Sequence, residues 1–259
     1  MHGICTLSIV PCRKKPASKS EMVTQLLFGE TFQVLEKPKK EWMRIRITHD
    51  SYEGWVNRKQ VQLLPEAAFQ KIKSASLVCT SDLVQVITNI SDRSMFPVVI
   101  GSLLPSFSGS ECSIDKNKYI YEGQTVKATK LNKEGIVETA YLFLNAPYLW
   151  GGRSPFGIDC SGFTQIVYRL NGYKLQRDAH QQAEQGEPLS FIEEAEPGNL
   201  AFFDNEEGKI THVGIVLEDG MIIHASGKVR IDKLDHHGIY NEEMKKYTHR
   251  LRVIKRFLP

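Results

Sequence analysis

The spacing of apolar residues changes once along this chain, just after Lys127. Before that point, short apolar runs alternate with polar turns, and "WMRIRIT" places Met43, Ile45 and Ile47 at the period of two that is typical of a half-buried strand. After it, helical spacing comes first and strand patterns follow. Short strands, then helices, then a sheet predict small β-domains followed by an α+β domain of about 130 residues.

Two small barrels are predicted in the first part. "TQLLFGETFQVLE" indicates two strands that meet at Phe28-Gly29, and another strand runs through Trp55-Val56, so residues 1–66 are expected to form one barrel. A weaker pattern of the same kind continues in "LVQVIT", "FPVVIGSLLPSF" and "YIYEGQTV". We therefore expect residues 67–128 to be a second, diverged copy.

The remaining domain, residues 129–259, begins with two predicted helices. "LNKEGIVETAYLFLNAP" places four apolar residues on one helical face, with a capping residue ahead of them: Ile136, Val137, Ala140 and Leu144, with Asn132 as the cap. The second helix starts at Cys160, and "NG" at 171–172 ends it; its predicted buried face is Phe163, Ile166, Val167 and Leu170. "RDAHQQAEQG" predicts a polar helix, and four strands follow in "NLAFFDN", "HVGIVLEDG", "MIIHASG" and "RLRVIKRFL".

Composition excludes several classes of protein. A net charge of +3, without an arginine-rich arm, argues against nucleic-acid binding. No run of eighteen apolar residues is present, which argues against a membrane span, and the first residues do not read as a secretory signal. Five scattered cysteines without a C-x-x-C pair argue against a disulfide framework or a zinc knuckle. We expect a cytoplasmic protein without metal or cofactor; a removed export signal would make it periplasmic.

Cys160 is the first candidate catalytic residue, as a nucleophile. It lies between Asp159 and Ser161 at the start of an apolar helix, where unpaired N–H groups stabilise a thiolate and lower the thiol pKa. The same groups are able to form part of an oxyanion hole. The alternative, an inert cysteine in an apolar core, fits Cys79 and Cys112 better.

A nucleophilic cysteine needs a base, and two histidines meet the requirement. His212 lies at the start of one predicted strand and His224 near the end of the next. If these strands pair around Glu218-Asp219-Gly220, the two imidazoles lie near the same end of a hairpin, and His224 is placed to orient His212. His249 gives no such signal, and a metal site at His236-His237 lacks further ligands.

Four stretches carry a resemblance: "PYLWGGRSPFGIDCSGFTQ", "LQRDAHQQ", "PGNLAFF" and "THVGIVLEDGMIIHASG". Together, in this order, they resemble the NlpC-type bacterial cysteine peptidases of the cell wall, which have a papain-like fold. The resemblance implies that Cys160 is the nucleophile, His212 the general base and His224 the third member. It also implies that Tyr148 helps to hold the oxyanion and that Asp159 is mainly structural.

The upstream part resembles tandem bacterial SH3-like domains, on "SEMVTQLLFGE" and "YEGWV". The whole arrangement is similar to the γ-D-glutamyl-L-diamino-acid endopeptidases, also called dipeptidyl-peptidase VI. These enzymes cut murein peptides with a free N-terminal L-Ala and release L-Ala-D-Glu, and the resemblance implies the same reaction in peptidoglycan recycling, with diaminopimelate or lysine left open. The resemblance implies neither a membrane partner nor the need for an oligomer.

The free amino group demands acidic or phenolic partners in a partly desolvated pocket. The resemblance places Asp178, Tyr52 and Glu21 there, with Glu30 as the alternative to Glu21. It further implies that Arg177 and Ser161 meet the α-carboxylate of D-glutamate and that Trp150 lines the pocket beside L-alanine; a core tryptophan and an exposed Asp–Arg pair are the alternatives.

The chain departs from the family pattern at two positions, and two other functions stay open. Ala179 stands where serine is common, which removes one substrate hydrogen bond or leaves it to water, and Asn199 replaces an aspartate in a turn. A wall-binding SH3-like protein with weak catalysis is one alternative. An amidase or acyltransferase on the same fold is the other. The intact set of Cys160, His212 and His224 argues against the first.

Overall fold

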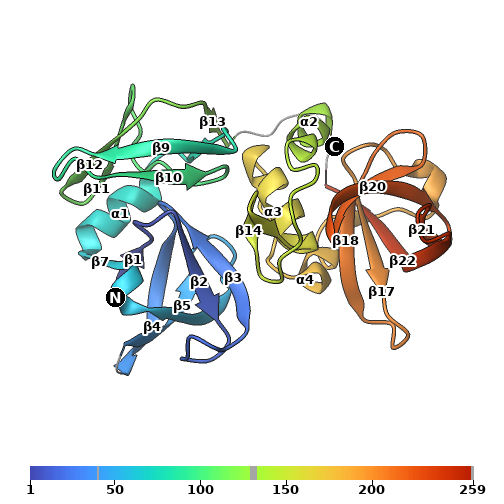
Figure 1. Ribbon diagram of the computed structural model, residues 1–259, viewed down its shortest axis with the longest axis horizontal. Coiled ribbons are helices and arrows are strands. Elements are labelled where there is room, and N and C mark those ends of the chain that lie inside the picture. The colour runs from blue at the N-terminus through green and yellow to red at the C-terminus, as the bar shows by residue number, and fades with distance from the viewer. Residues whose placement is uncertain (40, 129–132, 258–259) are drawn as a thin grey trace. The chain divides into compact units, whose positions relative to one another are not determined.

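We describe a computed structural model of the chain, over residues 1–39, 41–128 and 133–257. The chain divides into two compact units: Met1–Ala128 with Trp150–Ser154, and Thr129–Leu149 with Pro155–Pro259 (Figure 1). The short segment Trp150–Ser154, just ahead of the predicted nucleophile, thus belongs to the N-terminal unit. Among the described residues, no helix combines the length and the apolar character needed to cross a membrane.

The N-terminal unit begins with a seven-stranded antiparallel sheet in the order β3-β2-β6-β5-β4-β1-β7. The predicted strands are confirmed: the turn at Phe28-Gly29 separates β3 from β4, and Met43, Ile45 and Ile47 are buried. The strands are β1 (His2–Ile4), β2 (Ile9–Arg13), β3 (Met22–Leu27), β4 (Thr31–Lys39), β5 (Trp42–Ile47), β6 (Glu53–Asn57) and β7 (Gln62–Leu64), with a 3-10 turn at Arg58–Gln60.

The second part of this unit packs against the first. Helix α1 (Glu66–Ser74), which sequence patterns did not predict, joins them. Phe28 of the first sheet lies against Phe96 and Tyr119, with ring centroids 5.8 and 5.3 Å away, so both parts share one core. One sheet has the order β10-β9-β12-β11 and β13 pairs with β8; the bounds are β8 (Val78–Thr80), β9 (Val84–Asn89), β10 (Met95–Val99), β11 (Glu111–Ile114), β12 (Asn117–Tyr121) and β13 (Thr125–Lys127). The division at 66/67 and the repeat stay predictions.

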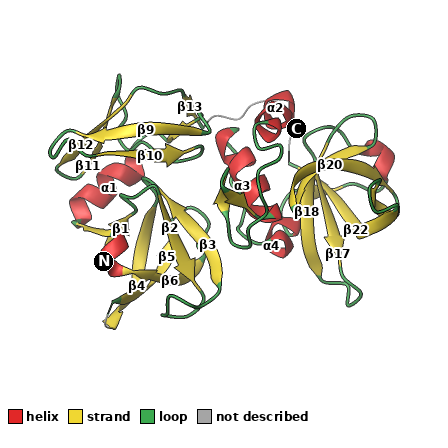
Figure 2. Ribbon diagram, viewed as in Figure 1, coloured by secondary structure: helices red, strands yellow, loops and turns green. Residues whose placement is uncertain are grey.

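In the C-terminal unit, helices precede a seven-stranded sheet (Figure 2), as the change in spacing predicts. The sheet has the order β16-β22-β17-β18-β19-β20-β21, and helix α3 packs against β18 and β19. The bounds are α2 (Lys133–Tyr141), β14 (Arg153–Ser154), β15 (Gly157–Ile158), α3 (Cys160–Leu170), α4 (Ala179–Ala183), β16 (Glu187–Pro188), a 3-10 turn at Ile192–Glu194, β17 (Leu200–Asp204), β18 (Ile210–Val216), β19 (Met221–Ser226), β20 (Lys228–Asp235), β21 (Gly238–Asn241) and β22 (Lys246–Arg256); of these, β14 lies in the segment that belongs to the N-terminal unit.

The predicted helices are present, with one correction. Helix α3 is buried on all sides and ends at Leu170 with Asn171 as its C-cap, as expected. Helix α2 ends at Tyr141, so Leu144 lies beyond it and is 40% exposed, while Phe143 is buried in its place. The predicted apolar face is wrong at Leu144 because the helical period stops one turn earlier. The cap predicted at Asn132 lies outside the described residues.

The β18–β19 hairpin forms at the predicted turn. Asp219 and Gly220 both have positive φ, 55° and 65°, which is the backbone of the tight turn that suits twisted hairpins. Gly214 pairs with His224 across the strands, so His212 lies two residues along β18 from the position opposite His224. On the other side of β19 lies β20, where Arg230 is the residue paired with His224.

Candidate active site

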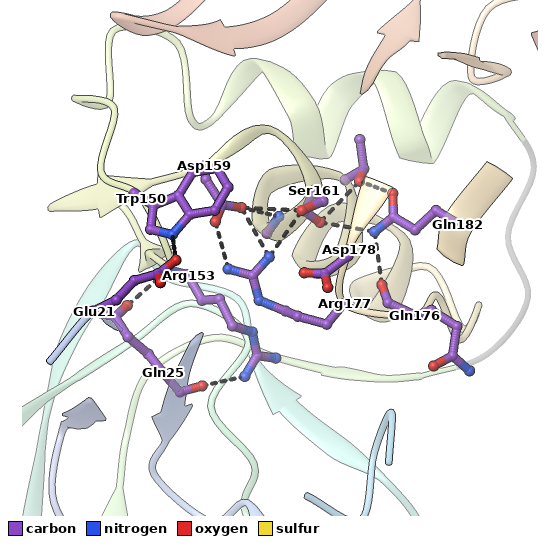
Figure 3. A network of polar contacts seen from close by, with 12 residues as sticks. Glu21, Gln25, Trp150, Arg153, Asp159, Ser161, Gln176, Arg177, Asp178 and Gln182 are labelled. Carbon is purple, nitrogen blue, oxygen red and sulfur yellow. Dashed lines mark hydrogen bonds and ion pairs between the residues drawn. The ribbon is translucent and has the colours of Figure 1, made fainter. Parts of the chain in front are cut away.

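Helix α3 places Cys160 in its first turn. Asp159 is the N-cap, and its carboxylate accepts a 2.7 Å hydrogen bond from the Gly162 N–H. The carboxylate is itself held by Arg177, whose two terminal nitrogens lie 3.0 and 2.6 Å from its oxygens. This buried bidentate pair fixes the start of the helix (Figure 3), in agreement with the structural role expected of Asp159.

The Cys160 thiol is buried, with 6% of the residue exposed. The pKa of this thiol is raised to about 12, mainly by burial and then by the charge of Asp159; the N–H groups of Val213 and Ser161 and the charge of Arg177 lower it by less. The predicted lowering of the thiol pKa is therefore wrong, because loss of hydration outweighs the N–H groups at the helix terminus. At rest the sulfur carries its proton, and a base must take it during attack.

The predicted base, His212, belongs to a hydrogen-bonded relay across three neighbouring strands. His212 Nε2 on β18 lies 2.8 Å from His224 Nδ1 on β19, and His224 Nε2 lies 3.0 Å from Asp232 Oδ2 on β20. Arg230 in turn donates to both oxygens of Asp232, at 2.7 and 3.0 Å. The predicted meeting of the two imidazoles is confirmed, and Asp232 extends the relay by one member.

The relay determines which nitrogen of His212 is basic. The hydrogen bonds from His224 and Arg230 outweigh burial and hold the pKa of Asp232 below its usual value, so this side chain only accepts hydrogen bonds. His224 therefore carries its proton on Nε2 and accepts at Nδ1. His212 then donates from Nε2, which leaves Nδ1 as its free lone pair.

Both imidazoles are neutral at pH 7. Burial, then the neighbouring rings of His224 and His249, lower the pKa of His212 well below 6.5. For His224, burial lowers the pKa and outweighs the opposing effect of the hydrogen bond that its Nε2 donates to Asp232. A neutral Cys160 thiol and neutral imidazoles, all of them buried, are thus the resting state.

Tyr148 lies near the nucleophile, as predicted. Burial, followed by the charges of Cys160 and Asp159, raises the pKa of its hydroxyl to about 12, so it stays a hydrogen-bond donor. Its backbone bridges to Ile158, two residues before Cys160, and its N–H donates to the Gly227 carbonyl at 3.0 Å. An oxyanion role for Tyr148 stays a prediction.

The residues predicted to contact D-glutamate and the amino group in this unit have partners within the protein. The Ser161 hydroxyl accepts a 2.9 Å hydrogen bond from Arg177, which is only 1% exposed. Asp178 is the N-cap of α4 and forms a capping box with Gln181, whose side chain accepts from the Asp178 N–H at 3.1 Å. Arg177 is a buried ion-pair partner, not an exposed one, and the substrate roles of all three residues stay predictions.

In the N-terminal unit, Trp150 is 58% exposed, which excludes the alternative of a core tryptophan. Its indole N–H donates to Glu21 at 3.0 Å (Figure 3), and Glu21 also pairs with Lys14 at 3.0 Å. Hydrogen bonds from Lys14 and Trp150 lower the pKa of the Glu21 carboxyl. Tyr52 packs at the edge of the core of the first sheet, and its N–H donates to Asp50 at 3.0 Å.

Glu30, the alternative acid, is buried at 1% exposure and belongs to a different contact. Its oxygens lie 2.8 and 3.0 Å from Arg153, and it accepts from the Leu27 N–H at 2.9 Å. Arg153 also donates to the Gln25 carbonyl at 2.7 Å. The pair anchors the segment Trp150–Ser154 inside its unit, and Glu30 is thereby neutralised.

Sequence reasoning missed two members of the hydrogen-bonded relay, Asp232 and Arg230, and one ring that lies beside it, His249. Asp232 lies where the alternation of "KVRIDKLD" changes phase, which is a weak signal. His249 on β22 carries none, yet its ring stacks on His212, with centroids 4.1 Å apart and planes 25° apart. Burial and then the charge of His224 lower its pKa to about 4.

Comparison with known proteins identifies two domains in the chain. Residues 145–252 match the NlpC/P60 family, and residues 12–61 match the bacterial dipeptidyl-peptidase SH3 domain. The chain is 27% identical over 239 residues to a gamma-D-glutamyl-L-lysine dipeptidyl-peptidase of Bacillus subtilis (strain 168), which covers 86% of this chain and 74% of the relative. It is 25% identical over 275 residues to dipeptidyl-peptidase 6 of Lysinibacillus sphaericus, covering 94% and 96%.

Solved structures show the same fold. An NlpC/P60 family protein from Bacillus cereus ATCC 10987 superposes with a TM-score of 0.86 at 20% identity, over 100% of both chains. An NlpC/P60 endopeptidase from Photobacterium damselae subsp. piscicida gives 0.76 at 17% identity, over 97% of this chain and 70% of that one. The predicted fold, an α+β papain-like peptidase domain behind an SH3-like domain, is thus confirmed. The C-terminal part of the chain is an NlpC/P60 cysteine peptidase domain, and an SH3 domain of the bacterial dipeptidyl-peptidase kind lies in the part before it.

Proposed function

We propose that the protein is an endopeptidase that hydrolyses the bond between γ-D-glutamate and an L-diamino acid in murein peptides with a free N-terminal L-Ala, and so releases L-Ala-D-Glu. One observation carries the chemistry: Cys160 begins α3 beside Val213, and the relay of His212, His224 and Asp232 starts one residue before Val213. The substrate is supported by the relatives, whose names specify a gamma-D-glutamyl-L-lysine dipeptidyl-peptidase.

The reaction follows from the protonation states of the site. His212 Nδ1 takes the thiol proton while the Cys160 sulfur bonds to the γ-carbonyl carbon of D-glutamate. The amine of the diamino acid leaves with the proton from His212, which leaves an acyl-enzyme. Water then attacks this thioester and gives its proton to His212. The C–S bond breaks, the carboxyl product departs, and His212 returns the proton to the Cys160 sulfur. In each half-reaction the imidazolium charge is stabilised through His224 by Asp232.

An amino-group pocket on Asp178, Tyr52 and Glu21 is part of the proposal. Of the two acids considered for the first sheet, Glu21 is the better supported, because its side chain and that of its ion-pair partner Lys14 are 40% and 64% exposed, whereas Glu30 and its partner Arg153 are both buried. Trp150 holds Glu21 through its indole N–H. An ammonium group is recognised by such carboxylates at partly desolvated sites.

The test uses purified protein and two tripeptides, L-Ala-γ-D-Glu-L-Lys and its diaminopimelate counterpart. Mass spectrometry is expected to show L-Ala-D-Glu from at least one of them, no product from N-acetylated peptides, and no product with Cys160→Ala. Cleavage of acetylated and free peptides at equal rates would contradict the amino-group pocket. Release of ammonia or acyl transfer in place of the dipeptide would identify the alternative activities.

Two variants test the pocket itself. Tyr52→Phe and Glu21→Gln are expected to raise KM at least fivefold with kcat nearly unchanged, since they remove binding contacts and not the relay. Glu111→Gln, an exposed acid in the same unit, is the matched control. Equal KM in all three would remove the N-terminal unit from substrate binding. The cytoplasmic location in peptide recycling stays a prediction, which cell fractionation would test.

A further inference from the structure

Three histidine side chains, His212, His224 and His249, lie close together; we call them the imidazole cluster. One ring nitrogen of each residue lies within 4.8 Å of one ring nitrogen of each of the others. Three imidazoles from three strands, converging at this distance, match the ligand set of many zinc sites. The reaction proposed above uses His212 and His224 and assigns no part to His249.

The surroundings of the imidazole cluster also fit a metal site. A histidine that binds zinc usually donates its other N–H to a carboxylate, and His224 Nε2 is held in this way by Asp232 at 3.0 Å. The third ring is oriented as well, since the Thr248 hydroxyl lies 2.9 Å from His249 Nδ1. Burial keeps the rings neutral, and neutral imidazole is the form that binds metals.

One member of the imidazole cluster lines a cavity. His249 and Thr211, the residue before His212, line a cavity of about 810 Å³. Glu206 lines the same cavity and its carboxylate attracts cations to it, whereas the carboxylate of Asp204, also in the lining, is paired with Arg250 at 2.7 Å. The cavity therefore gives an ion access to His249, and the opening of the His212–His224 contact completes the site.

We propose that the imidazole cluster binds Zn²⁺ or a similar imidazole-preferring divalent ion, and that this ion inhibits the peptidase. Nitrogens on one tetrahedral zinc lie about 3.3 Å apart. The His212–His224 contact of 2.8 Å must therefore open, and the ring of His249 must turn toward the other two.

Inhibition follows from the proton on His212. Metal on Nε2 displaces the hydrogen that Nε2 now donates to His224, and this hydrogen moves to Nδ1. Nδ1 is then no longer a lone pair, so it cannot accept the thiol proton of Cys160. The inhibition rests on the proposed function, whereas the metal binding does not.

Direct binding is the first experiment. Cys160→Ala protein, in which no catalytic thiol competes, is titrated with Co²⁺ and followed by its ligand-field absorption, and then with Zn²⁺ by calorimetry. We expect one ion per chain and at least a tenfold weaker affinity when His249→Phe is added, because phenylalanine keeps the ring stack and removes the ligand. His237→Phe, from the same cavity, is the control and should bind as before. Equal affinity with and without His249 would overturn the proposal.

Inhibition is the second experiment, on protein with Cys160 intact. Without metal, His249→Phe and His237→Phe should cleave the tripeptide within about twofold of the wild type. Zn²⁺ should inhibit the wild type and His237→Phe, reversibly with EDTA, and His249→Phe should need at least tenfold more. Equal sensitivity of all three would assign the effect to Cys160 alone and refute the proposal. The binding experiment gives its result even if the tripeptide is not the substrate.

Discussion

Replacing Arg153 by leucine is expected to destabilise the N-terminal unit by about 3–5 kcal/mol, because removal of one partner leaves an uncompensated buried charge. Arg153 and Glu30 are 0% and 1% exposed, and two short contacts of 2.8 and 3.0 Å join them. In the variant, the Leu27 N–H at 2.9 Å still donates to the carboxylate. One such hydrogen bond stabilises the buried carboxylate less than the hydration of the unfolded chain or the guanidinium of Arg153 does.

The chain offers a selective probe of this unit. Its three tryptophans, Trp42, Trp55 and Trp150, all belong to the N-terminal unit, so tryptophan fluorescence reports unfolding of this unit alone. With a urea m-value of about 2 kcal/mol/M, the midpoint of unfolding should fall by about 1.5–2.5 M. Lys118→Met breaks the exposed pair with Glu111 in the same unit and should cost less than about 1 kcal/mol.

A double variant separates the charge from the packing. Glu30→Leu combined with Arg153→Leu removes both charges, and we expect it to recover at least half of the stability that Arg153→Leu loses. If Arg153→Leu costs no more than the exposed control, or if the double variant is the sum of the two single ones, the pair does not act as a buried charge pair and the reasoning is refuted.

Three further predictions concern the C-terminal unit. Alkylation of Cys160 by iodoacetamide without substrate should keep rising above pH 9, because burial raises the thiol pKa to about 12; a plateau near pH 7 would show a resting thiolate. Asp232→Asn should lower kcat at least tenfold with little change in KM, since the tautomer of His224 is no longer fixed; unchanged kcat would remove Asp232 from the relay. His249 has a lowered pKa in the folded state, so it takes up a proton on unfolding at acid pH, and stability is lost as the pH falls from about 6.5 to about 4. Circular dichroism should show a smaller loss over this range for His249→Phe, and identical curves would contradict the lowered pKa.

Local patterns in the sequence predicted much of the fold. The period of two in "WMRIRIT" identified β5 and its buried face, and Asp219-Gly220 identified the hairpin that brings His212 and His224 together. These features follow from backbone geometry over a few residues, which neighbouring side chains largely determine. Leu144 shows where such reasoning fails, because the end of α2 is set by packing beyond the helix.

What the sequence by itself determined was therefore the order of elements, the helix that begins at Cys160 and the two histidines of the hairpin. Tertiary structure alone decided the rest: Asp232 behind His224, His249 stacked on His212, and the joining of Arg153 to Glu30 across 123 positions. It also decided the sign of the shift in the thiol pKa of Cys160. The physical reason is that desolvation and ion pairing depend on which distant residues surround a group, and no local spacing encodes that.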